Sequence, residues 1–150
     1  MKKKKGPDPV DPQRSALMAR VRQRQSKPEL AAQRALCRLG IRFRLHSRQL
    51  PGTPDIVVPT ANCAIFVHGC FWHRHEGCSK ATIPKTRVLF WTDKFTRNVA
   101  RDARKTRQLR KLGWRVITVW ECQCKDFEKL ERRLNRIISA SKTKAIKKLS

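Results

Sequence analysis

The sequence predicts an α/β (α+β) fold in which a mixed β-sheet is flanked by helices. Short β-branched runs alternate with turn signals, and longer segments carry apolar residues at helical spacing. In chain order they predict a helix, three strands, a long irregular segment, a helix, a strand and a helix. The 150 residues fit one domain. We expect it over residues 26–138, between a basic, flexible arm (1–25) and a basic tail (139–150).

The first helix is expected over residues 27–39. Ser26 and Glu29 fit a capping box with Pro28 at an early helical position, and Gly40 ends the pattern. The apolar residues recur at helical spacing: Ala32, Ala35, Leu36 and Leu39.

Three strands follow. Apolar and polar residues alternate over 41–45, which is typical of a strand with one solvated face, and the Pro-Gly-Thr-Pro segment 51–54 predicts a turn. Two β-branched runs, 55–58 and 63–67, then predict adjacent strands.

The second half of the chain alternates again between helix and strand. Residues 69–91 have no clean period and predict an irregular loop, whereas 92–112 predict a helix that Gly113 ends. One face of this helix collects Phe95, Val99, Asp102, Thr106 and Leu109. Residues 114–120 predict a buried strand, and a last amphipathic helix is indicated by Phe127, Leu130, Leu134 and Ile137.

The charge of the chain indicates a polyanionic partner. Lys and Arg number 36 against 11 Asp and Glu, which gives a formal charge of +25. Nucleic acid is the natural partner of such a charge. No segment approaches the roughly 20 apolar residues of a membrane span, and no apolar segment follows the basic start as in a signal peptide. We expect a cytoplasmic protein that lies with the chromosome.

The cysteines predict a structural zinc site. Cys70, His75 and Cys78 are closely spaced, and Cys122 follows the 114–120 strand, although Cys124 competes with it as the fourth ligand. Four N and S ligands suit tetrahedral Zn²⁺, which would fix a loop without backbone periodicity. The alternative is a set of buried free thiols. Core thiols are expected at the two remaining positions, Cys37 and Cys63.

A carboxylate and two histidines are candidates for catalysis. Asp55 opens one predicted strand and His68 closes its neighbour, with His73 close behind. A carboxylate can hold Mg²⁺ against a phosphodiester, and a neutral histidine can take a proton from water. Asp55 could equally be a turn aspartate. Glu29 could serve only as the capping acid and Asp102 only as a core-facing acid paired with an arginine.

Two aromatic pairs, Phe71-Trp72 and Phe90-Trp91, lie in the predicted loop among basic residues. Flat side chains inserted between base pairs unstack and bend DNA, at a cost that further contacts offset. Alternatively, they anchor the loop to the core. Both interpretations stay open.

Several motifs together resemble the very-short-patch-repair (Vsr) mismatch endonucleases over about residues 12–138. The matching segments are Leu50–Asp55, Phe66–His73, Asn98–Asp102, Leu112–Val116 and Trp120–Cys122. The resemblance implies a restriction-endonuclease-like fold with an added structural zinc site, and residues 26–138 as the endonuclease domain.

The resemblance also implies roles for particular residues. Asp55 matches the Mg²⁺ ligand, His73 the general base, and His68 a residue near the scissile phosphate. Glu29 and Asp102 match acids that support the histidines. The zinc ligands match Cys70, His75, Cys78 and Cys122, and the DNA-intercalating wedge matches Phe71, Trp72 and Trp91, with a weaker match at Phe90.

The implied activity is strand-specific DNA repair. The enzyme would recognise a T·G mismatch left by deamination of 5-methylcytosine and hydrolyse the phosphodiester 5′ of the T, with Mg²⁺ as catalytic and Zn²⁺ as structural cofactor. A monomer suffices for one nick, and mismatch-repair proteins are further candidate partners. Val67 departs from relatives that carry a hydroxyl residue there.

Two other function classes fit parts of the sequence. A zinc-containing, non-catalytic DNA-binding protein explains the charge and the cysteines but leaves Asp55, His68 and His73 without a purpose. A sequence-specific restriction endonuclease would cut both strands of a matched duplex. EDTA-sensitive nicking excludes the former, and a duplex without a T·G pair tests the latter.

Overall fold

The sheet predicted from the sequence is present and mixed. The computed structural model describes residues 26–148, with side chains through 141, so the predicted arm over 1–25 lies outside the described residues. Four strands follow one another across the sheet: β1 (Arg44–Leu45), β2 (Ile56–Val58), β3 (Cys63–His68) and β4 (Arg115–Trp120). The β1–β2 and β2–β3 pairs are antiparallel, whereas β3 and β4 are parallel.

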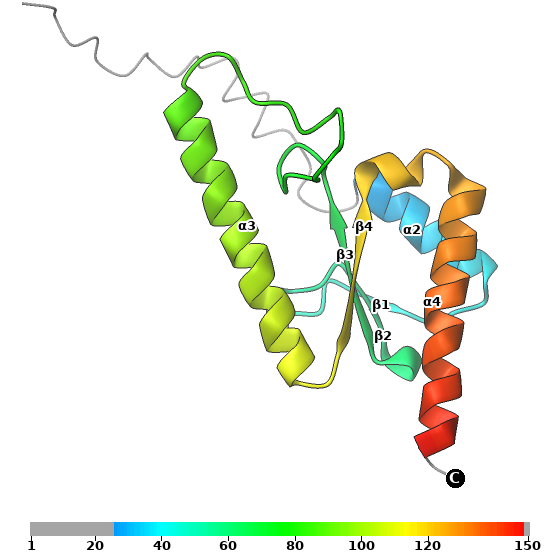
Figure 1. Cartoon of the computed structure of the whole chain (residues 1–150). Helices are drawn as coiled ribbons and strands as arrows, with labels where there is room; N and C mark the ends of the chain where they lie inside the picture. Colours follow the sequence, from blue (N-terminus) through cyan, green and yellow to red (C-terminus); the bar gives the residue numbers. More distant parts are fainter. Residues whose placement is uncertain (1–25, 149–150) are drawn as a thin grey trace, which may run out of the picture.

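Helices cover both faces of the sheet (Figure 1). α2 (Lys27–Arg38) and α4 (Phe127–Lys148) pack together on one face, and α3 (Val88–Lys111) lies along the other. The larger core cluster joins α2 and α4 to the sheet. Its fully or almost fully buried members include Ala32, Ala35, Leu36, Ile56, Ile65, Val119, Leu130, Leu134 and Ile138. A smaller cluster on the α3 face contains Ala64, Phe66 and Leu109.

The alternation of β3 decides which face carries the candidate site. Cys63 and Ile65 belong to the core under α2 and α4, whereas Ala64 and Phe66 belong to the α3 cluster. Successive side chains of a strand point to opposite faces, so His68 shares the α3 face with Phe66. The last residue of the strand therefore meets the helix that carries Asp102.

Two helix ends differ from the prediction. α3 begins at Val88 rather than near Thr92, so Phe90 and Trp91 lie in its first turn and not in a loop. Its N-cap is Arg87, which has a left-handed backbone (φ 53°) and no side-chain capping bond, so the usual capping signal is missing from the sequence. α4 continues to Lys148, through most of the segment expected to be a tail.

Some predicted faces were also wrong in detail. The strand expected over 41–45 is reduced to two residues, because β1 is an edge strand and His46 leaves it with a left-handed backbone (φ 47°). Val99 is 45% exposed, and Ile137 is only partly buried against the core, whereas its neighbour Ile138 is fully buried. Cys37 is exposed, whereas Cys63 is a buried thiol as predicted.

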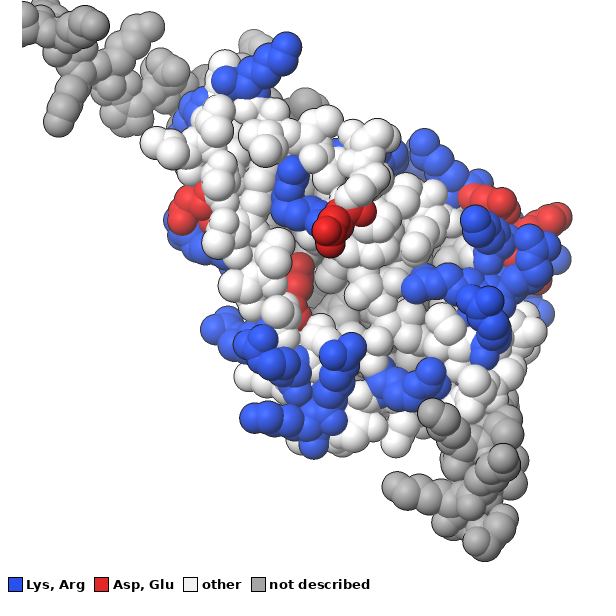
Figure 2. Space-filling view, viewed as in Figure 1, with Lys and Arg blue, Asp and Glu red and all other residues white. Residues whose placement is uncertain are grey.

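The positive charge is spread over the surface of the described residues (Figure 2). One group of Lys and Arg side chains lies over the C-terminal half of α3, at the lower left of the view. Only a few acidic side chains are seen on this face. This half of the helix carries Arg101, Arg104, Lys105, Arg107, Arg110 and Lys111. Within residues 26–148 no helix is long and apolar enough to cross a membrane.

Candidate active site and metal centre

Asp55 lies where the antiparallel β2–β3 pair brings the start of one strand to the end of the other. Its Oδ2 accepts a hydrogen bond from the backbone N–H of Val67 at 2.7 Å, one residue before His68. Burial raises the pKa of the Asp55 carboxyl, and this hydrogen bond and the nearby His46, His73 and Lys105 offset the effect only in part. The sheet thus fixes a half-buried carboxylate beside the last residues of β3.

The two candidate histidines stack on each other. The rings of His68 and His73 are parallel to within 6°, with centroids 3.9 Å apart. Burial, helped by the neighbouring His73, lowers the pKa of His68 to about 4. His68 is therefore a neutral imidazole at neutral pH, able to donate one hydrogen bond and to accept another.

Asp102 orients His73. Its Oδ2 lies 2.6 Å from Nδ1 of His73. Burial acts to raise the pKa of Asp102, but the hydrogen bond to His73 and nearby positive charges outweigh it, so the pKa is lowered. An ionised carboxylate only accepts, so Nδ1 of His73 carries the hydrogen, and in the neutral form of the ring the lone pair then lies on Nε2. The acid expected on the α3 face is thus partnered by a histidine and not by an arginine.

Residues 69–87, which contain no helix or strand, are held in place by side chains. The guanidinium of Arg74 donates to the carbonyls of Phe71, Ala81 and Thr82, and it lies 4.1 Å from the ring centroid of Phe95 on α3. Asn98 of α3 donates to the carbonyl of Trp72 at 3.2 Å. These contacts join residues 71–74 of the loop to residues 81–82 and fix the loop against α3.

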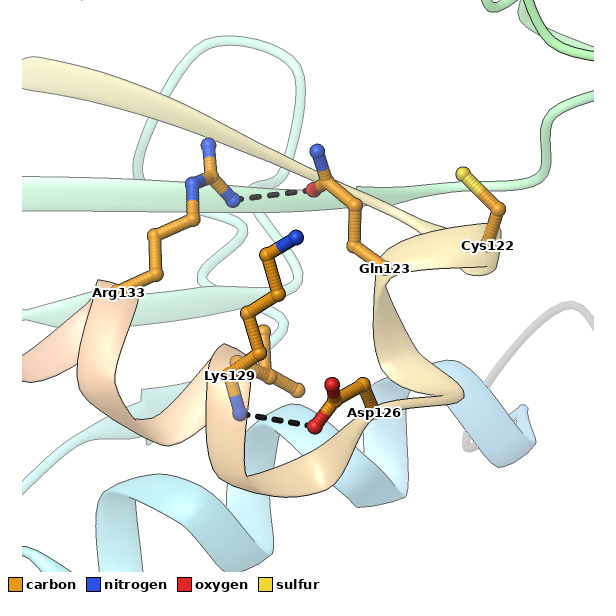
Figure 3. A pocket seen from close by; sticks show the side chains of 6 residues that line it. Cys122, Gln123, Asp126, Lys129 and Arg133 are labelled. Atoms are coloured by element: carbon orange, nitrogen blue, oxygen red, sulfur yellow. Dashed lines mark hydrogen bonds between the residues drawn. The ribbon is translucent and has the colours of Figure 1, made fainter.

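The end of β4 turns into a short 3₁₀ helix, η2 (Glu121–Cys124), which carries Cys122. Arg133 of α4 donates to Oε1 of Gln123 at 3.1 Å and to the carbonyl of Thr118, and Figure 3 shows Gln123 and Arg133 beside this turn. The position of Cys122 is therefore tied to the core helix α4 as well as to the sheet.

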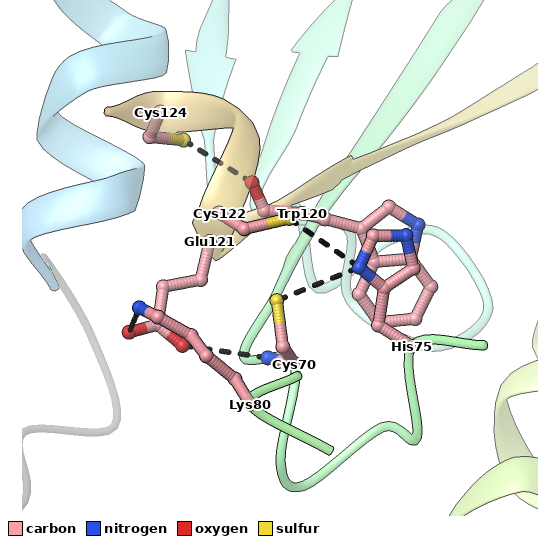
Figure 4. Close-up of polar contacts among 7 residues, drawn as sticks. All are labelled: Cys70, His75, Lys80, Trp120, Glu121, Cys122 and Cys124. Atoms are coloured by element: carbon pink, nitrogen blue, oxygen red, sulfur yellow. Dashed lines mark hydrogen bonds and ion pairs between the residues drawn. The ribbon is translucent and has the colours of Figure 1, made fainter. Parts of the chain in front are cut away.

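The four predicted zinc ligands come together, and Figure 4 shows three of them, Cys70, His75 and Cys122. The ligand atoms of Cys70, His75, Cys78 and Cys122 all lie within 4.8 Å of one another. Nδ1 of His75 is 3.6 Å from the Cys70 sulfur and 3.4 Å from the Cys122 sulfur. Tetrahedral bonds of about 2.3 Å to sulfur and 2.0 Å to nitrogen separate such atoms by about 3.5 Å, so the donor set fits Zn²⁺.

Cys124 does not join this cluster. Its sulfur lies 3.7 Å from the carbonyl of Pro28 in α2 and 3.6 Å from the carbonyl of Trp120. Burial raises the pKa of this thiol to about 11. Of the two competing cysteines, the structure therefore brings Cys122 to the candidate metal centre.

Side chains around the cluster connect it to the sheet. The ring of His75 stacks on Trp120, with centroids 4.2 Å apart and 9° between the planes. Glu121 accepts from the backbone N–H of Cys70 at 3.4 Å and from Lys80 at 3.1 Å. The end of β4 thus holds the loop that carries both His73 and the candidate zinc ligands.

The predicted wedge residues pack against one another. Phe71, Trp72, Trp91 and Phe95 form a chain of ring contacts with centroids 5.1–5.9 Å apart. Trp91 is buried and the loop aromatics are half-buried, so in this conformation the cluster anchors the loop to α3. At the tip of the helix the apolar side chains are exposed: Val88 by 46%, Leu89 by 87% and Phe90 by 45%.

Glu29 lies in a second cluster of possible metal ligands, with His46 and Asp55. It sits in the first turn of α2, where its N–H donates to the Ser26 side chain at 3.4 Å, while its carboxylate lies 3.8 Å from Nε2 of His46. His46 was not among the predicted site residues, although a histidine at the end of the alternating segment that precedes the Pro-Gly turn is a usable signal.

Lys105 is a further missed residue. Its charge acts on Asp55, His68 and Asp102. Its side chain lies so close to Gly52 (φ 76°) that a Cβ there would be 2.6 Å from it. Because Gly52 has no side chain, Lys105 of α3 can pass close to the Pro-Gly turn and reach the site.

Known proteins match this chain closely. The family of DNA mismatch endonucleases named Vsr matches residues 8–80. The type II nicking enzyme V.XorIIP of Xanthomonas oryzae pv. oryzae is 47% identical over 135 residues, which cover 89% of this chain and 98% of that enzyme. The chain belongs to the Vsr family. The DNA mismatch endonuclease Vsr of Escherichia coli K12 is 50% identical over 91 residues, which cover 61% of this chain and 58% of that protein.

Membership of the Vsr family settles the broad activity. The chain is an endonuclease that hydrolyses phosphodiester bonds of DNA, and DNA is the partner that its charge predicted. The mixed sheet with helices on both faces agrees with the restriction-endonuclease-like fold that the resemblance implied.

Proposed function

We propose that this enzyme is a Mg²⁺-dependent mismatch endonuclease that nicks the T strand at a T·G mismatch, 5′ of the T, and so starts very short patch repair. The observation that carries the proposal is the His73–Asp102 pair, held at the end of the sheet that also carries Asp55. The site thus brings a candidate general base, His73, near a candidate metal ligand, Asp55.

Each residue of the site has a different role in hydrolysis. When bound at Asp55, Mg²⁺ would polarise the scissile phosphate and stabilise the charge on the leaving oxygen. Nε2 of His73 takes a proton from the attacking water, and the Asp102 carboxylate stabilises the imidazolium that forms. His68 is neutral and donates a hydrogen bond to the phosphate. The leaving 3′ oxygen takes a proton from solvent water, so the products are a 3′-hydroxyl and a 5′-phosphate.

A structural zinc ion on Cys70, His75, Cys78 and Cys122 is part of the proposal. The donor set is soft, and the two distances from His75 to sulfur, 3.6 and 3.4 Å, are close to the spacing expected of tetrahedral ligands. Its role is to fix the loop between β3 and α3, which lacks a backbone hydrogen-bond ladder. The loop then presents His73 to Asp102.

Mismatch recognition is assigned to the aromatic cluster. Phe71, Trp72 and Trp91 would insert beside the T·G pair, which is less costly to unstack than a matched pair. The ammonium of Lys94 lies 5.1 Å from the Trp72 ring and 5.5 Å from the Trp91 ring, where it can also reach a phosphate. One nick needs one active site, so we propose that the enzyme works as a cytoplasmic monomer.

A second candidate is nicking at a sequence-specific site without a mismatch. Its support is that V.XorIIP, and V.NmeAIP of Neisseria meningitidis at 38% identity over 125 residues, are named type II nicking enzymes. The V.NmeAIP match covers 83% of this chain and 89% of that enzyme. Both candidates use the same catalytic residues. They differ in the DNA feature that is recognised, a T·G mismatch or a particular base sequence.

The deciding experiment compares two labelled duplexes that differ in one base. One carries a T·G mismatch in a CC(A/T)GG-like context and the other is fully matched, both with Mg²⁺ and with EDTA as control. Mg²⁺-dependent nicking of the mismatched duplex alone supports the proposal. Equal nicking of both supports the second candidate. Tight binding without nicking in a series of flanking sequences contradicts both and favours a binding protein.

A further inference from the structure

We propose that His46 is a nitrogen ligand of the metal site at Asp55, together with Glu29, and that it makes this site prefer Co²⁺-like metals over Mg²⁺. The inference rests on the proposed metal-dependent nicking and concerns a residue outside the family motifs of the sequence. Ligand atoms of Glu29, His46 and Asp55 all lie within 4.8 Å of one another.

The backbone directs His46 toward this site. The residue follows the two-residue strand β1 and has a left-handed backbone, with φ at 47°. That conformation is uncommon for a residue other than glycine and is fixed here by a hydrogen bond from the His46 N–H to the carbonyl of Asp55 at 3.0 Å. Such strain persists where the surroundings impose it, and it is concentrated at functional sites.

The side chain of His46 is enclosed. It is 17% exposed, and its Nε2 atom is buried without a hydrogen-bond partner among the described residues. The nearest carboxylate oxygen, Oε2 of Glu29, lies 3.8 Å away, which is too far for a hydrogen bond. A buried ring nitrogen that makes no hydrogen bond is costly unless a ligand fills the place.

The spacing suits a shared cation. Two atoms that bind one octahedral ion at about 2.1 Å lie about 3 Å apart when adjacent and about 4.2 Å apart when opposite. The 3.8 Å between Glu29 and His46 falls in this range. The hydrogen bond from Val67 uses Oδ2 of Asp55, and the buried side chain of Glu29 comes from the first turn of α2. Three elements thus supply two oxygens and one nitrogen.

The nitrogen changes which metal the site prefers. Carboxylate and water ligands suit Mg²⁺, whereas imidazole adds affinity for later transition metals in the order Mn²⁺, Fe²⁺, Co²⁺. Removal of His46 should therefore weaken Co²⁺ binding by about tenfold or more and change Mg²⁺ binding by about threefold or less.

The test is calorimetric titration of the zinc-loaded, DNA-free protein with CoCl₂, with Mg²⁺ affinity measured by competition. His46→Asn is the main variant because asparagine tolerates a left-handed backbone, and His46→Ala is the second. Gln49→Ala, an exposed change in the same connection, is the matched control. Asp55→Ala should lose both metals, and thermal unfolding checks that each variant is folded.

Selective loss of Co²⁺ affinity in both His46 variants, with Gln49→Ala unchanged, supports the ligand role. Equal Co²⁺ affinity in folded His46→Asn and wild-type protein, or no Co²⁺ binding by the wild type, overturns it. The proposed function fails separately: if metal binding follows the prediction but T·G duplexes are not nicked, the ligand set stands and the assigned substrate is wrong.

Discussion

The two regions that meet at the active site are built in different ways. Asp55 directly precedes β2 and His68 ends β3, so backbone ladders and a core cluster on each face of the sheet hold them. His73 belongs to a loop without a helix or strand, held by Arg74, by ring contacts and by the proposed zinc. The comparison teaches that the metal carboxylate and the base depend on separate supports, so each can be lost while the other keeps its place.

The largest expected effect is on the sheet side. Asp55→Ala should lower the single-turnover nicking rate by about a thousandfold or more, because several kcal/mol of charge stabilisation is lost with the metal. Binding to a T·G duplex and thermal stability should change little. Glu128→Ala, an exposed acid on α4, is the control. Loss of DNA binding in folded Asp55→Ala protein would argue against the metal role.

On the loop side, His73→Ala should reduce the nicking rate by about 10²–10⁴-fold through loss of the base. Asp102→Asn should give a smaller loss, since the ring remains and only its orientation and charge stabilisation suffer. Rates over a pH series measure both variants. A His73→Ala enzyme with the wild-type rate would show that another group takes the proton.

Removal of a zinc ligand should destabilise the loop region much more than the sheet region. Cys70→Ser is expected to lose zinc and about 3–5 kcal/mol of unfolding free energy, the size of effect typical for loss of a metal site. Hydrogen exchange should accelerate in residues 69–87 and much less in β2 and β3. Cys37→Ser, at an exposed thiol, is the control. A fully stable and active Cys70→Ser protein would refute the structural role of zinc.

The smallest effects concern the pH dependence of stability, where the two acids should differ in sign. The lowered pKa of Asp102 stabilises the fold above pH 3.8, and this contribution disappears as the pH falls through the folded value. The raised pKa of Asp55 costs stability once the pH exceeds 3.8, where the unfolded chain ionises first.

In urea unfolding without Mg²⁺, Asp102→Asn should therefore be less stable than wild type near pH 7, and Asp55→Asn more stable. Both differences should shrink below pH 3.8. The same sign for both variants at neutral pH would contradict this account of the site.

The parts of the fold that depend on local patterns could be predicted from the sequence. Runs of β-branched residues gave β2 and β3, helical spacing gave α2 and α4, and the cysteine spacing gave the cluster of candidate zinc ligands. A helix or strand that buries one face shows this as a repeat of apolar residues within its own segment, so the signal can be read from that segment alone. The start of α3 was missed because Arg87 enters the helix without a side-chain cap.

The site could be predicted as a set of residues but not as a geometry. The stacking of His68 on His73, and the approach of Lys105 past Gly52, depend on how a loop and a helix pack on the sheet. His46 could be noticed as a histidine at a strand end, but its approach to Glu29 and Asp55 depends on a left-handed backbone and on how α2 packs beside the sheet. Contacts between distant segments leave no periodic trace in one sequence.

The most direct test of the central claim is to map the nick. A T·G duplex labelled on either strand is incubated with Mg²⁺, and the products are sized beside a sequence ladder and tested for ligation. We expect one break, 5′ of the mismatched T, in that strand only, with a ligatable 3′-hydroxyl and 5′-phosphate. Breaks in both strands, or equal cutting of the matched duplex, would contradict it.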